Sequence, residues 1–437
     1  MKNYKLVLKT GLLVMTQFLA TSNCLGQWEL FRNAPPLFSG ARYDNLAFSD
    51  SLHGSVVGPS GEIHTTMDGG FTWESTVNIP NYFRSICYQS RDTGFVGSLE
   101  GRLYKTTDGG LSWVNITSRI PAQAPVICGL MAYGDYVFGT GNFAAPAEFI
   151  KSADRGETWE YIALDSLLFG AVDVYFFDEN VGIIGGIGLP KADGLGSLGT
   201  VIMTEDGGMS WRIIGESNIP NSYVWKFDVL SNGKIFGALQ TFTGDIPAYI
   251  KADGLSEPFE TFVIEDESGL AFDAQGIGFL NDDHGWLTGW GIGHFETLDG
   301  GETWHRQEGT SQINRLIRLD ETTMLGAGSS VFAYSDMTAS TSEDHIYNQE
   351  WPHTLHKVYP NPVADEMQVS LHLSAHTLVM IHVVTAQGQI VQQHMKQTLP
   401  SGQHEFRLDT SRLANGQYIL VVRTYERHMS QPFQVQR

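Results

Sequence analysis

The sequence predicts an all-β protein in which a seven-bladed β-propeller, closed by the N-terminal strand, precedes a small Ig-like β-sandwich. Three observations predict this fold: a turn motif recurs at intervals of 37 to 52 residues, the N-terminal segment resembles the end of that motif, and the C-terminal region alternates between apolar and polar residues. The chain contains 48 glycines and only 17% charged residues. This composition favours turn-rich β structure, because glycine adopts the positive φ of tight turns without strain.

Residues 1–26 are expected to be a signal peptide. Lys2 and Lys5 precede an apolar stretch from Leu6 to Leu19, small residues follow, and cleavage near Gly26 fits this order. The apolar stretch is too short for a membrane-spanning helix, and we expect no other segment to span a membrane. Lipidation of Cys24 stays open as an alternative.

The repeated motif reads Ser or Thr, any residue, Asp, any residue, Gly, any residue, Ser or Thr, Trp. We expect each Asp to fix a turn by accepting backbone N–H bonds, Gly to take a positive φ, and Trp to pack between neighbouring sheets. These aspartates are therefore expected to be structural rather than catalytic. The five full copies contain Asp68 and Trp73, Asp108 and Trp113, Asp154 and Trp159, Asp206 and Trp211, and Asp299 and Trp304.

This motif resembles the Asp-box, or BNR, repeat of sialidase-like and related β-propellers. Most copies follow a segment that reads as a strand, a polar turn and a second short strand ending in Gly, such as 177–185 and 280–289. With the two strands of the box, each repeat then has four strands. The combination is more similar to propellers related to the photosystem II stability and assembly factor than to true sialidases.

Two weaker repeats complete a predicted count of seven blades over residues 27–337, although six or eight remain possible. Lys251-Ala252-Asp253-Gly254 reads as a degraded box, and Ser335-Asp336-Met337 ends another repeat. The last repeat lacks its outer strand. Residues 27–31 can supply that strand, because Trp28 matches the box tryptophans, and closure removes open sheet edges.

Residues 338–356 are polar and read as a linker, and residues 357–437 contain about seven short strands, which predicts a small β-sandwich. Its sequence resembles the type A sorting domain of type IX secretion. The resemblance rests on Tyr359-Pro360-Asn361-Pro362, a central Gly-Gln turn, and a Leu-x-x-Gly-x-Tyr motif that includes Gly416 and Tyr418. It implies that the type IX machinery is a partner, and that the protein is secreted or held at the outer-membrane surface after export to the periplasm.

Three neighbouring blades carry long connections between their second and third strands, at residues 140–148, 187–200 and 239–247. Loops on a rigid scaffold often carry function, so these loops are the predicted wall of a binding site. The candidate ligand-contacting residues are Phe143, Lys191, Trp225, Phe242, Asp245 and Tyr249. The expected ligand is a glycan or an envelope or extracellular protein.

We expect no catalysis, cofactor or metal site. No arginine triad of the sialidase kind is visible by spacing, and neither metal-ligand spacing nor a nucleotide-binding motif is present. A formal net charge of −21 argues against a nucleic-acid partner. Two alternatives stay open: a sialidase-like glycoside hydrolase, and an assembly factor for another secreted protein, the latter by analogy with the photosystem-related propellers.

Overall fold

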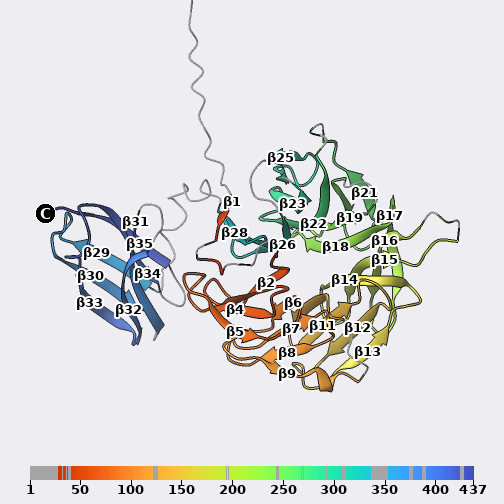
Figure 1. Cartoon of the computed structure of the whole chain (residues 1–437), viewed down its shortest axis with the longest axis horizontal. Coiled ribbons are helices and arrows are strands. Elements are labelled where there is room, and N and C mark those ends of the chain that lie inside the picture. Colours follow the sequence, from red (N-terminus) through yellow and green to blue (C-terminus); the bar gives the residue numbers. More distant parts are fainter. Residues whose placement is uncertain are drawn as a thin grey trace, which may run out of the picture. The chain divides into compact units, whose positions relative to one another are not determined.

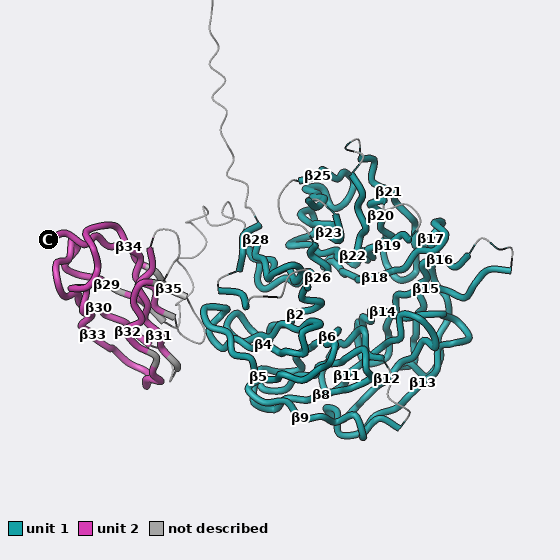
Figure 2. Tube along the Cα trace, viewed as in Figure 1, with its two compact units in different colours: residues 1–341 teal, residues 342–437 magenta. Residues whose placement is uncertain are grey.

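The structure is a computed structural model, and it describes residues 28–31, 33–35, 37, 41–121, 126–192, 194, 196–242, 246–266, 268, 270–291, 293–307, 312–335, 353–373, 377–385, 390–423 and 428–437. The chain forms two compact units, residues 1–341 (unit 1) and residues 342–437 (unit 2) (Figure 2). The predicted signal peptide, Cys24, Asp245 and most of the predicted linker lie outside the described residues.

Unit 1 contains seven four-stranded antiparallel sheets among its described residues (Figure 1), which we number sheet 1 to sheet 7 in chain order. Sheets 1 to 3 consist of β2 (Asn45–Phe48), β3 (Gly54–Val57), β4 (Glu62–Thr66) and β5 (Glu74–Asn78); β6 (Phe83–Tyr88), β7 (Gly94–Ser98), β8 (Leu103–Thr106) and β9 (Val114–Asn115); and β10 (Gly129–Tyr133), β11 (Tyr136–Gly141), β12 (Glu148–Ser152) and β13 (Glu160–Ala163). A short 3-10 helix, Thr117–Arg119, follows β9.

Sheets 4 to 7 continue the same order along the chain. They consist of β14 (Leu168–Phe176), β15 (Gly182–Gly188), β16 (Leu198–Thr204) and β17 (Arg212–Pro220); β18 (Ser222–Val229), β19 (Ile235–Thr241), β20 (Ala248–Ala252) and β21 (Glu260–Val263); β22 (Phe272–Phe279), β23 (Gly285–Gly291), β24 (His294–Thr297) and β25 (His305–Gln307); and β26 (Ile313–Arg318), β27 (Thr323–Gly328) and β28 (Val331–Ser335) with β1 (Trp28–Leu30).

The seven sheets form a closed ring. The first strand of each sheet contacts the first strand of the next, and β26 of sheet 7 contacts β2 of sheet 1 again. The N-terminal strand β1 is the outer strand of sheet 7, where Trp28 lies opposite Tyr334 of β28. The Trp28 ring also packs edge-on against Trp286 of sheet 6, with 5.4 Å between ring centroids. The first and last segments of unit 1 are therefore joined in one sheet.

The core of unit 1 lies between neighbouring sheets. All seven residues of β15 are buried, and the sequence Gly-Ile-Ile-Gly-Gly-Ile-Gly is apolar throughout because both faces of the strand are covered. One core cluster joins Ile183 and Val201 of sheet 4 to Val224 and Ile250 of sheet 5. Each sheet is thus stabilised mainly by the sheets beside it.

The antiparallel order gives the ring two distinct ends. Connections between second and third strands, together with the starts of first strands, lie at one end, which we call the loop end. Turns between third and fourth strands, which contain the repeated motif, lie at the opposite end, which we call the box end. The loop end therefore carries the three long connections that the sequence singles out.

The repeated motif forms the same hydrogen-bonded turn at each full copy. In sheet 1, Asp68 Oδ1 accepts from Thr72 N at 2.8 Å, Asp68 Oδ2 accepts from Thr72 Oγ1 at 2.6 Å, and Thr66 Oγ1 accepts from Gly70 N at 2.7 Å. Gly70 has φ +86°, and a Cβ there would collide with the Phe31 ring. The carboxylate bonds recur around Asp108, Asp154, Asp206 and Asp299.

The box tryptophans pack on aromatic side chains of their own or the preceding sheet. Trp159 lies edge-on to Phe95 of sheet 2, Trp211 lies 5.1 Å from Phe149 of sheet 3, and Trp304 lies 5.5 Å from Tyr249 of sheet 5. These three rings thus span an interface between sheets. Trp73 packs on Phe48 of its own sheet and on Phe31, which follows β1 of sheet 7, and Trp113 packs on Tyr88 of its own sheet.

The residue immediately before the box often reaches across to another box. Lys105 Nζ donates to Arg155 O at 2.6 Å, and Lys151 Nζ donates to Gly207 O at 2.9 Å. Lys251 Nζ pairs with Glu302 at 2.9 Å. We call Lys105, Lys151 and Lys251 the fastener lysines, because each joins two neighbouring sheets at the box end.

Unit 2 consists of two antiparallel sheets with one shared core. One sheet has the order β29 (His353–Tyr359), β30 (Glu366–Leu373), β33 (Gly402–Asp409), and the other has the order β32 (Ile390–Leu399), β31 (Thr377–Thr385), β34 (Gly416–Arg423), β35 (His428–Val435). Val369 and Leu371 of the first sheet pack with Ile381 and Leu420 of the second. The alternation of β30 matches this burial, since every second residue faces the core.

Candidate functional site

The predicted loop residues Phe143 and Phe242 come together at the loop end. Phe143 lies in the connection between β11 and β12, and Phe242 lies in the connection between β19 and β20; their side chains are 43% and 58% exposed. Both contact Tyr223 of β18: its hydroxyl donates to Phe143 O at 2.7 Å, and its ring packs edge-on to Phe242 at 5.4 Å. The structure therefore joins loops of sheets 3 and 5 through Tyr223.

Trp225 of β18 extends this aromatic group toward the centre of the ring. It is buried, and its ring packs edge-on to Tyr223 at 5.9 Å. Its indole Nε1 has no hydrogen-bond partner among the described residues. A buried donor of this kind is uncommon, because desolvation without a partner costs free energy. Trp225 thus offers a donor beside the exposed aromatic side chains.

The other three candidates have different surroundings. Lys191 Nζ pairs with Glu216 of β17 at 2.6 Å, so its charge is engaged within its own sheet. Tyr249 is buried between sheets 5 and 6, and its hydroxyl donates to Gly301 O of a box turn at 2.9 Å. Tyr249 therefore supports the ring and is not presented at the loop end. Asp245 lies outside the described residues.

Two arginine–tryptophan pairs share one carboxylate beside Trp225. Arg84 of β6 stacks over Trp225 at 5.3 Å, and Arg42 stacks over Trp290 of β23 at 4.7 Å. Both guanidinium groups bind Asp44 Oδ1, Arg42 through Nε at 3.0 Å and Arg84 through Nη1. Burial lowers the pKa of Arg84, but the Asp44 charge opposes this and leaves that pKa above its usual value. Arg84 is thus a fixed cation in the centre of unit 1.

A second ion cluster adjoins the first. Asp173 of β14 binds Lys226 Nζ of β18 at 3.2 Å and Arg315 Nη1 of β26 at 3.2 Å. Lys226 is only 1% exposed, and burial lowers its pKa to about 8 despite the opposing Asp173 charge. Burial acts to raise the pKa of Asp173, but Lys226 and Arg315 hold it below the usual range. Asp173 is therefore ionised at neutral pH.

Bulges in the first strands help to place these side chains. The pairing of β6 skips Arg84, that of β18 skips Trp225, that of β22 skips Gln275 and that of β26 skips Asn314. A bulge turns a side chain away from the regular alternation of a strand. Asn314, the residue before Arg315, then donates to Asp44 Oδ1 at 3.2 Å.

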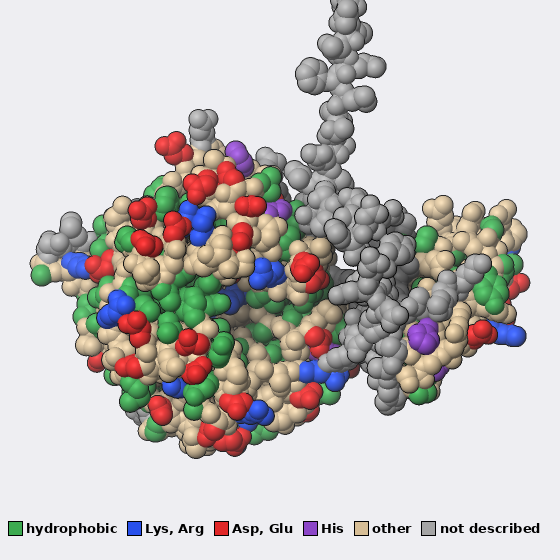
Figure 3. Space-filling model, turned by 180° about the vertical axis from the view of Figure 1, so that it is seen from behind, with side chains coloured by type: hydrophobic (Ala, Val, Ile, Leu, Met, Phe, Trp, Pro, Cys, Tyr) green, Lys and Arg blue, Asp and Glu red, His purple; other side chains and the backbone are tan. Residues whose placement is uncertain are grey.

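We call Arg42, Asp44, Arg84, Asp173, Lys226 and Arg315 the central charge cluster. It holds four cationic side chains against two carboxylates, which leaves a surplus of positive charge in a protein of formal net charge −21. Of the three guanidinium nitrogens of Arg84, Nη1 alone donates to an acceptor among the described residues. Its Nε and Nη2 therefore retain donor capacity. On the face drawn in Figure 3, unit 1 is hollowed near its centre, with hydrophobic side chains beside the hollow and basic ones in it.

Sequence reasoning did not find Tyr223 or the central charge cluster. The cluster combines residues of four first strands with Arg42 and Asp44, which precede β2, and no local spacing connects the five segments. One signal was available: Arg84, Asp173 and Lys226 are charged residues within mostly apolar, buried first strands. Charged side chains are rarely fully buried unless they are paired, so such positions indicate convergence on a partner.

The described residues offer no grouping of His, Cys, Asp and Glu side chains that could hold a metal ion. Cys87 and Cys128 are both buried and free. A search of the same described residues finds no helix with the length and apolar character needed to cross a membrane. The side chains that the structure gathers at the loop end are therefore cationic and aromatic.

The motifs of unit 2 hold its last strand in place. Asn361 of the Tyr-Pro-Asn-Pro segment accepts from Gln434 N of β35 at 2.8 Å. Tyr359 and Pro360 precede it at the end of β29, and Pro362 follows it. In β34, which begins at Gly416, the Tyr418 hydroxyl donates to Ala414 O at 3.1 Å, and its ring packs on Phe433 at 5.9 Å.

Comparison with solved structures shows the fold of unit 1. The chain is similar to YCF48 bound to D1 peptide, with 18% identity and a TM-score of 0.52 over 70% of this chain and 96% of that one. It is also similar to YCF48 from Cyanidioschyzon merolae, with 16% identity and a TM-score of 0.50 over 71% and 98%. The WD40 beta propeller domain of Doa1 matches with 14% identity and a TM-score of 0.52 over 72% and 98%. Unit 1 is therefore a β-propeller.

Comparison by sequence identifies unit 2. No curated protein is similar to the chain in sequence. Residues 357–436 match the family model described as secretion system C-terminal sorting domain. This match confirms the resemblance that the sequence motifs indicate. The chain is therefore a β-propeller protein that carries a type IX secretion C-terminal sorting domain and is exported to the cell surface or secreted.

Proposed function

We propose that the protein is a non-catalytic, seven-bladed Asp-box propeller that binds a carboxylate-bearing polypeptide outside the cell at the loop end of unit 1. The observation that carries this proposal is the central charge cluster, which has surplus positive charge and adjoins the aromatic group of Phe143, Tyr223, Trp225 and Phe242. Guanidinium groups bind carboxylates in a geometry that fits both partners, and aromatic rings supply apolar contact area.

The charge distribution supports an anionic peptide as the ligand class. The protein as a whole is acidic, so only a local cationic site attracts an anionic group. Aromatic and arginine side chains are the types that dominate protein-recognition sites. One structural neighbour, YCF48, is described as bound to a D1 peptide, and that description supports peptide binding by a propeller of this kind. A role as assembly factor for another secreted protein is a special case of the same proposal.

The proposal includes the route of export. Residues 1–26 serve as a cleaved signal peptide, residues 27–337 form the propeller, residues 338–356 link it to the sorting domain, and residues 357–437 form an Ig-like sandwich that engages the type IX machinery. The family match to residues 357–436 supports the last step. The order of basic, apolar and small residues at the N-terminus supports the first.

Peptide binding to the exported protein tests the ligand class. The probes are acidic octapeptides that end in phenylalanine, with either a free carboxylate or an amide at the C-terminus. We expect the free acids to bind, and amidation to weaken binding at least tenfold. Phe242→Ala and Arg315→Gln should weaken binding to a similar extent, whereas Leu111→Ala, an exposed apolar residue at the box end, should bind normally.

Three outcomes would contradict the proposal. If acid and amide peptides bind equally well, the central charge cluster does not recognise the ligand carboxylate. Turnover of a fluorogenic glycoside that disappears on substitution of a loop-end carboxylate would establish the glycosidase alternative instead. If the protein binds members of a glycan array but no peptide, its ligand is a glycan and not a polypeptide.

A further inference from the structure

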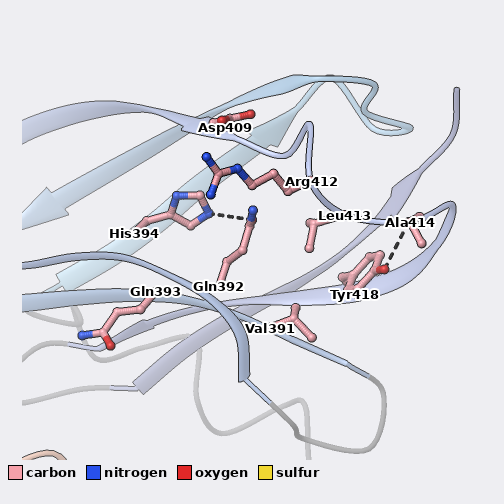
Figure 4. A pocket seen from close by; sticks show the side chains of 9 residues that line it. All are labelled: Val391, Gln392, Gln393, His394, Asp409, Arg412, Leu413, Ala414 and Tyr418. Atoms are coloured by element: carbon pink, nitrogen blue, oxygen red, sulfur yellow. Dashed lines mark hydrogen bonds between the residues drawn. The ribbon is translucent and has the colours of Figure 1, made fainter.

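A pocket opens on unit 2, separate from the propeller site (Figure 4). It lies between strand β32, the end of β33 and the turn of residues 410–415 that leads to β34. The side chains that line it are Val391, Gln392, Gln393, His394, Asp409, Arg412, Leu413, Ala414 and Tyr418. Leu413 and Tyr418 belong to the Leu-x-x-Gly-x-Tyr motif that identifies the sorting domain.

Strand β32, which forms one wall, is an edge strand. It is the first strand in the order of its sheet and pairs only with β31. An edge strand presents backbone N–H and C=O groups that another strand can pair with. The wall therefore offers both a side-chain pocket and backbone hydrogen bonds, which is the combination used in recognition by strand addition.

Two bulges shape this wall. The pairing of β32 with β31 skips His394 and Val391, and both skipped residues line the pocket. Bulges re-aim side chains, and on edge strands they discourage flat pairing with an identical strand. An identical strand cannot pair evenly along this bulged edge, so any added segment must match its irregular outline.

The pocket is lined by both apolar and polar side chains. Val391, Leu413 and Tyr418 supply apolar area, and Val391 is 39% exposed. His394 bonds Gln392 Oε1 through Nε2 at 3.1 Å, and burial lowers the pKa of His394, so the imidazole is neutral at pH 7. Arg412 and Asp409 place opposite charges in the lining. An uncharged apolar side chain with a polar surround is the matching ligand group.

The turn of residues 410–415, which forms the second wall of the pocket, is held by hydrogen bonds from Arg437. The Arg437 guanidinium donates to Leu413 O at 2.8 Å and to Thr410 O at 2.7 Å, and it pairs with Asp365 at 2.8 Å. Arg437 N also donates to Asn415 Oδ1 at 3.0 Å. The turn of residues 410–415 is therefore fixed before any partner binds, which lowers the entropic cost of association.

We infer that an extended segment of the outer-membrane type IX machinery adds to the edge of β32 and inserts an apolar side chain into this pocket. The inference rests on the sorting role of unit 2 and not on the ligand of the propeller. It assigns to the motif residues Leu413 and Tyr418 a recognition function in addition to packing.

Export of the full-length chain tests the inference in a bacterium that has the type IX system. Val391→Lys and Arg412→Glu change one apolar and one charged side chain of the pocket, and Arg407→Glu is the matched control, since Arg407 is an exposed arginine of β33 outside the pocket. We expect the double variant Val391→Lys with Arg412→Glu to lower the exported fraction at least tenfold and to accumulate in the periplasm. The control should be exported normally, and all variants should melt at the same temperature.

A photo-crosslinking amino acid at position 391 identifies the occupant. During export it should form an adduct with an outer-membrane component of the machinery, and the same amino acid at position 407 should not. Normal export of the double variant, or equal loss of export in Arg407→Glu, would overturn the inference. A wild-type dimer that the double variant abolishes without loss of export would show that a second copy occupies the pocket. Because the propeller ligand is not involved, this test fails or succeeds independently of peptide binding.

Discussion

At the scale of single residues, a buried charge can weaken the fold as well as support it. Asp228 of β18 accepts from Phe279 N of sheet 6 at 2.7 Å, yet burial raises the pKa of its carboxyl from 3.8 to about 6. The folded state therefore binds the proton more tightly than the unfolded state does. Stability from this group is present at low pH and is lost as the pH rises from about 4 through 6.

Asp228→Asn should consequently stabilise the protein at pH 8 by on the order of 1 kcal/mol, after allowance for the partial exposure of the side chain. The asparagine oxygen can still accept from Phe279 N. At pH 4 the two proteins should have equal free energies of unfolding. Thermal melts at pH 4, 6 and 8 measure the difference. A loss of stability in Asp228→Asn at every pH would mean that the hydrogen bond needs the charge.

Asp206, the aspartate of one box turn, behaves in the opposite way. Ser210 donates to Asp206 through its hydroxyl at 2.6 Å and its backbone N–H at 2.9 Å, and these bonds lower the pKa of Asp206 from 3.8 to about 2. The stabilisation is present above pH 4 and is lost as the pH falls toward 2. Asp206→Ala should lower the free energy of unfolding by about 2 kcal/mol at pH 7.

Glu205→Ala is the matched control for Asp206→Ala. Glu205 is the adjacent carboxylate and pairs with Arg212 at 3.4 Å on the surface, so its loss should change stability by less than about 0.5 kcal/mol. Urea denaturation at pH 7 and pH 3 compares the three proteins. Equal effects of the two substitutions at pH 7 would show that the turn does not depend on the box carboxylate.

At the scale of the elements, the structure reveals interactions that no local pattern predicts. The box turns follow from the sequence because all their partners lie within eight residues. The contact of Lys151 with Gly207 joins residues 56 positions apart, and only the ring brings them together. The same reason explains the candidate site: the loop lengths single out Phe143 and Phe242, but their shared partner Tyr223 lies on a first strand that reads as core.

The fastener lysines give the prediction at this scale. Lys151→Met keeps most of the apolar stem but removes the bond to Gly207 O, so it should destabilise the protein by about 1.5 kcal/mol. Lys191→Met, which breaks an exposed ion pair within one sheet, should cost less than about 0.5 kcal/mol. Chemical denaturation of both variants measures these costs. A cost for Lys151→Met no larger than that for Lys191→Met would show that the sheets are held by their apolar contacts alone.

At the scale of the whole molecule, the N-terminal strand joins the two ends of the propeller chain. The sequence predicts its place in the last sheet from one residue, Trp28, whose sequence context matches that of the box tryptophans. In the structure, Trp28 contacts Trp286 and Tyr334. The strand has only three residues, so backbone pairing alone is weak. The contacts of the indole with Trp286 and Tyr334 therefore help to keep the ring closed.

Trp28→Ala should lower the free energy of unfolding by about 3–5 kcal/mol, as expected for truncation of a large aromatic side chain in a packed site. Leu30→Ala is the control, because Leu30 is 70% exposed in the same strand. Release of β1 uncovers the edge of β28, and an uncovered edge pairs with other chains. Thermal melts and size-exclusion chromatography should therefore show that Trp28→Ala unfolds earlier and associates, whereas Leu30→Ala stays monomeric at the same concentration. If Trp28→Ala melts as the wild type does, ring closure must depend on contacts between β26 and β2 rather than on the N-terminal strand.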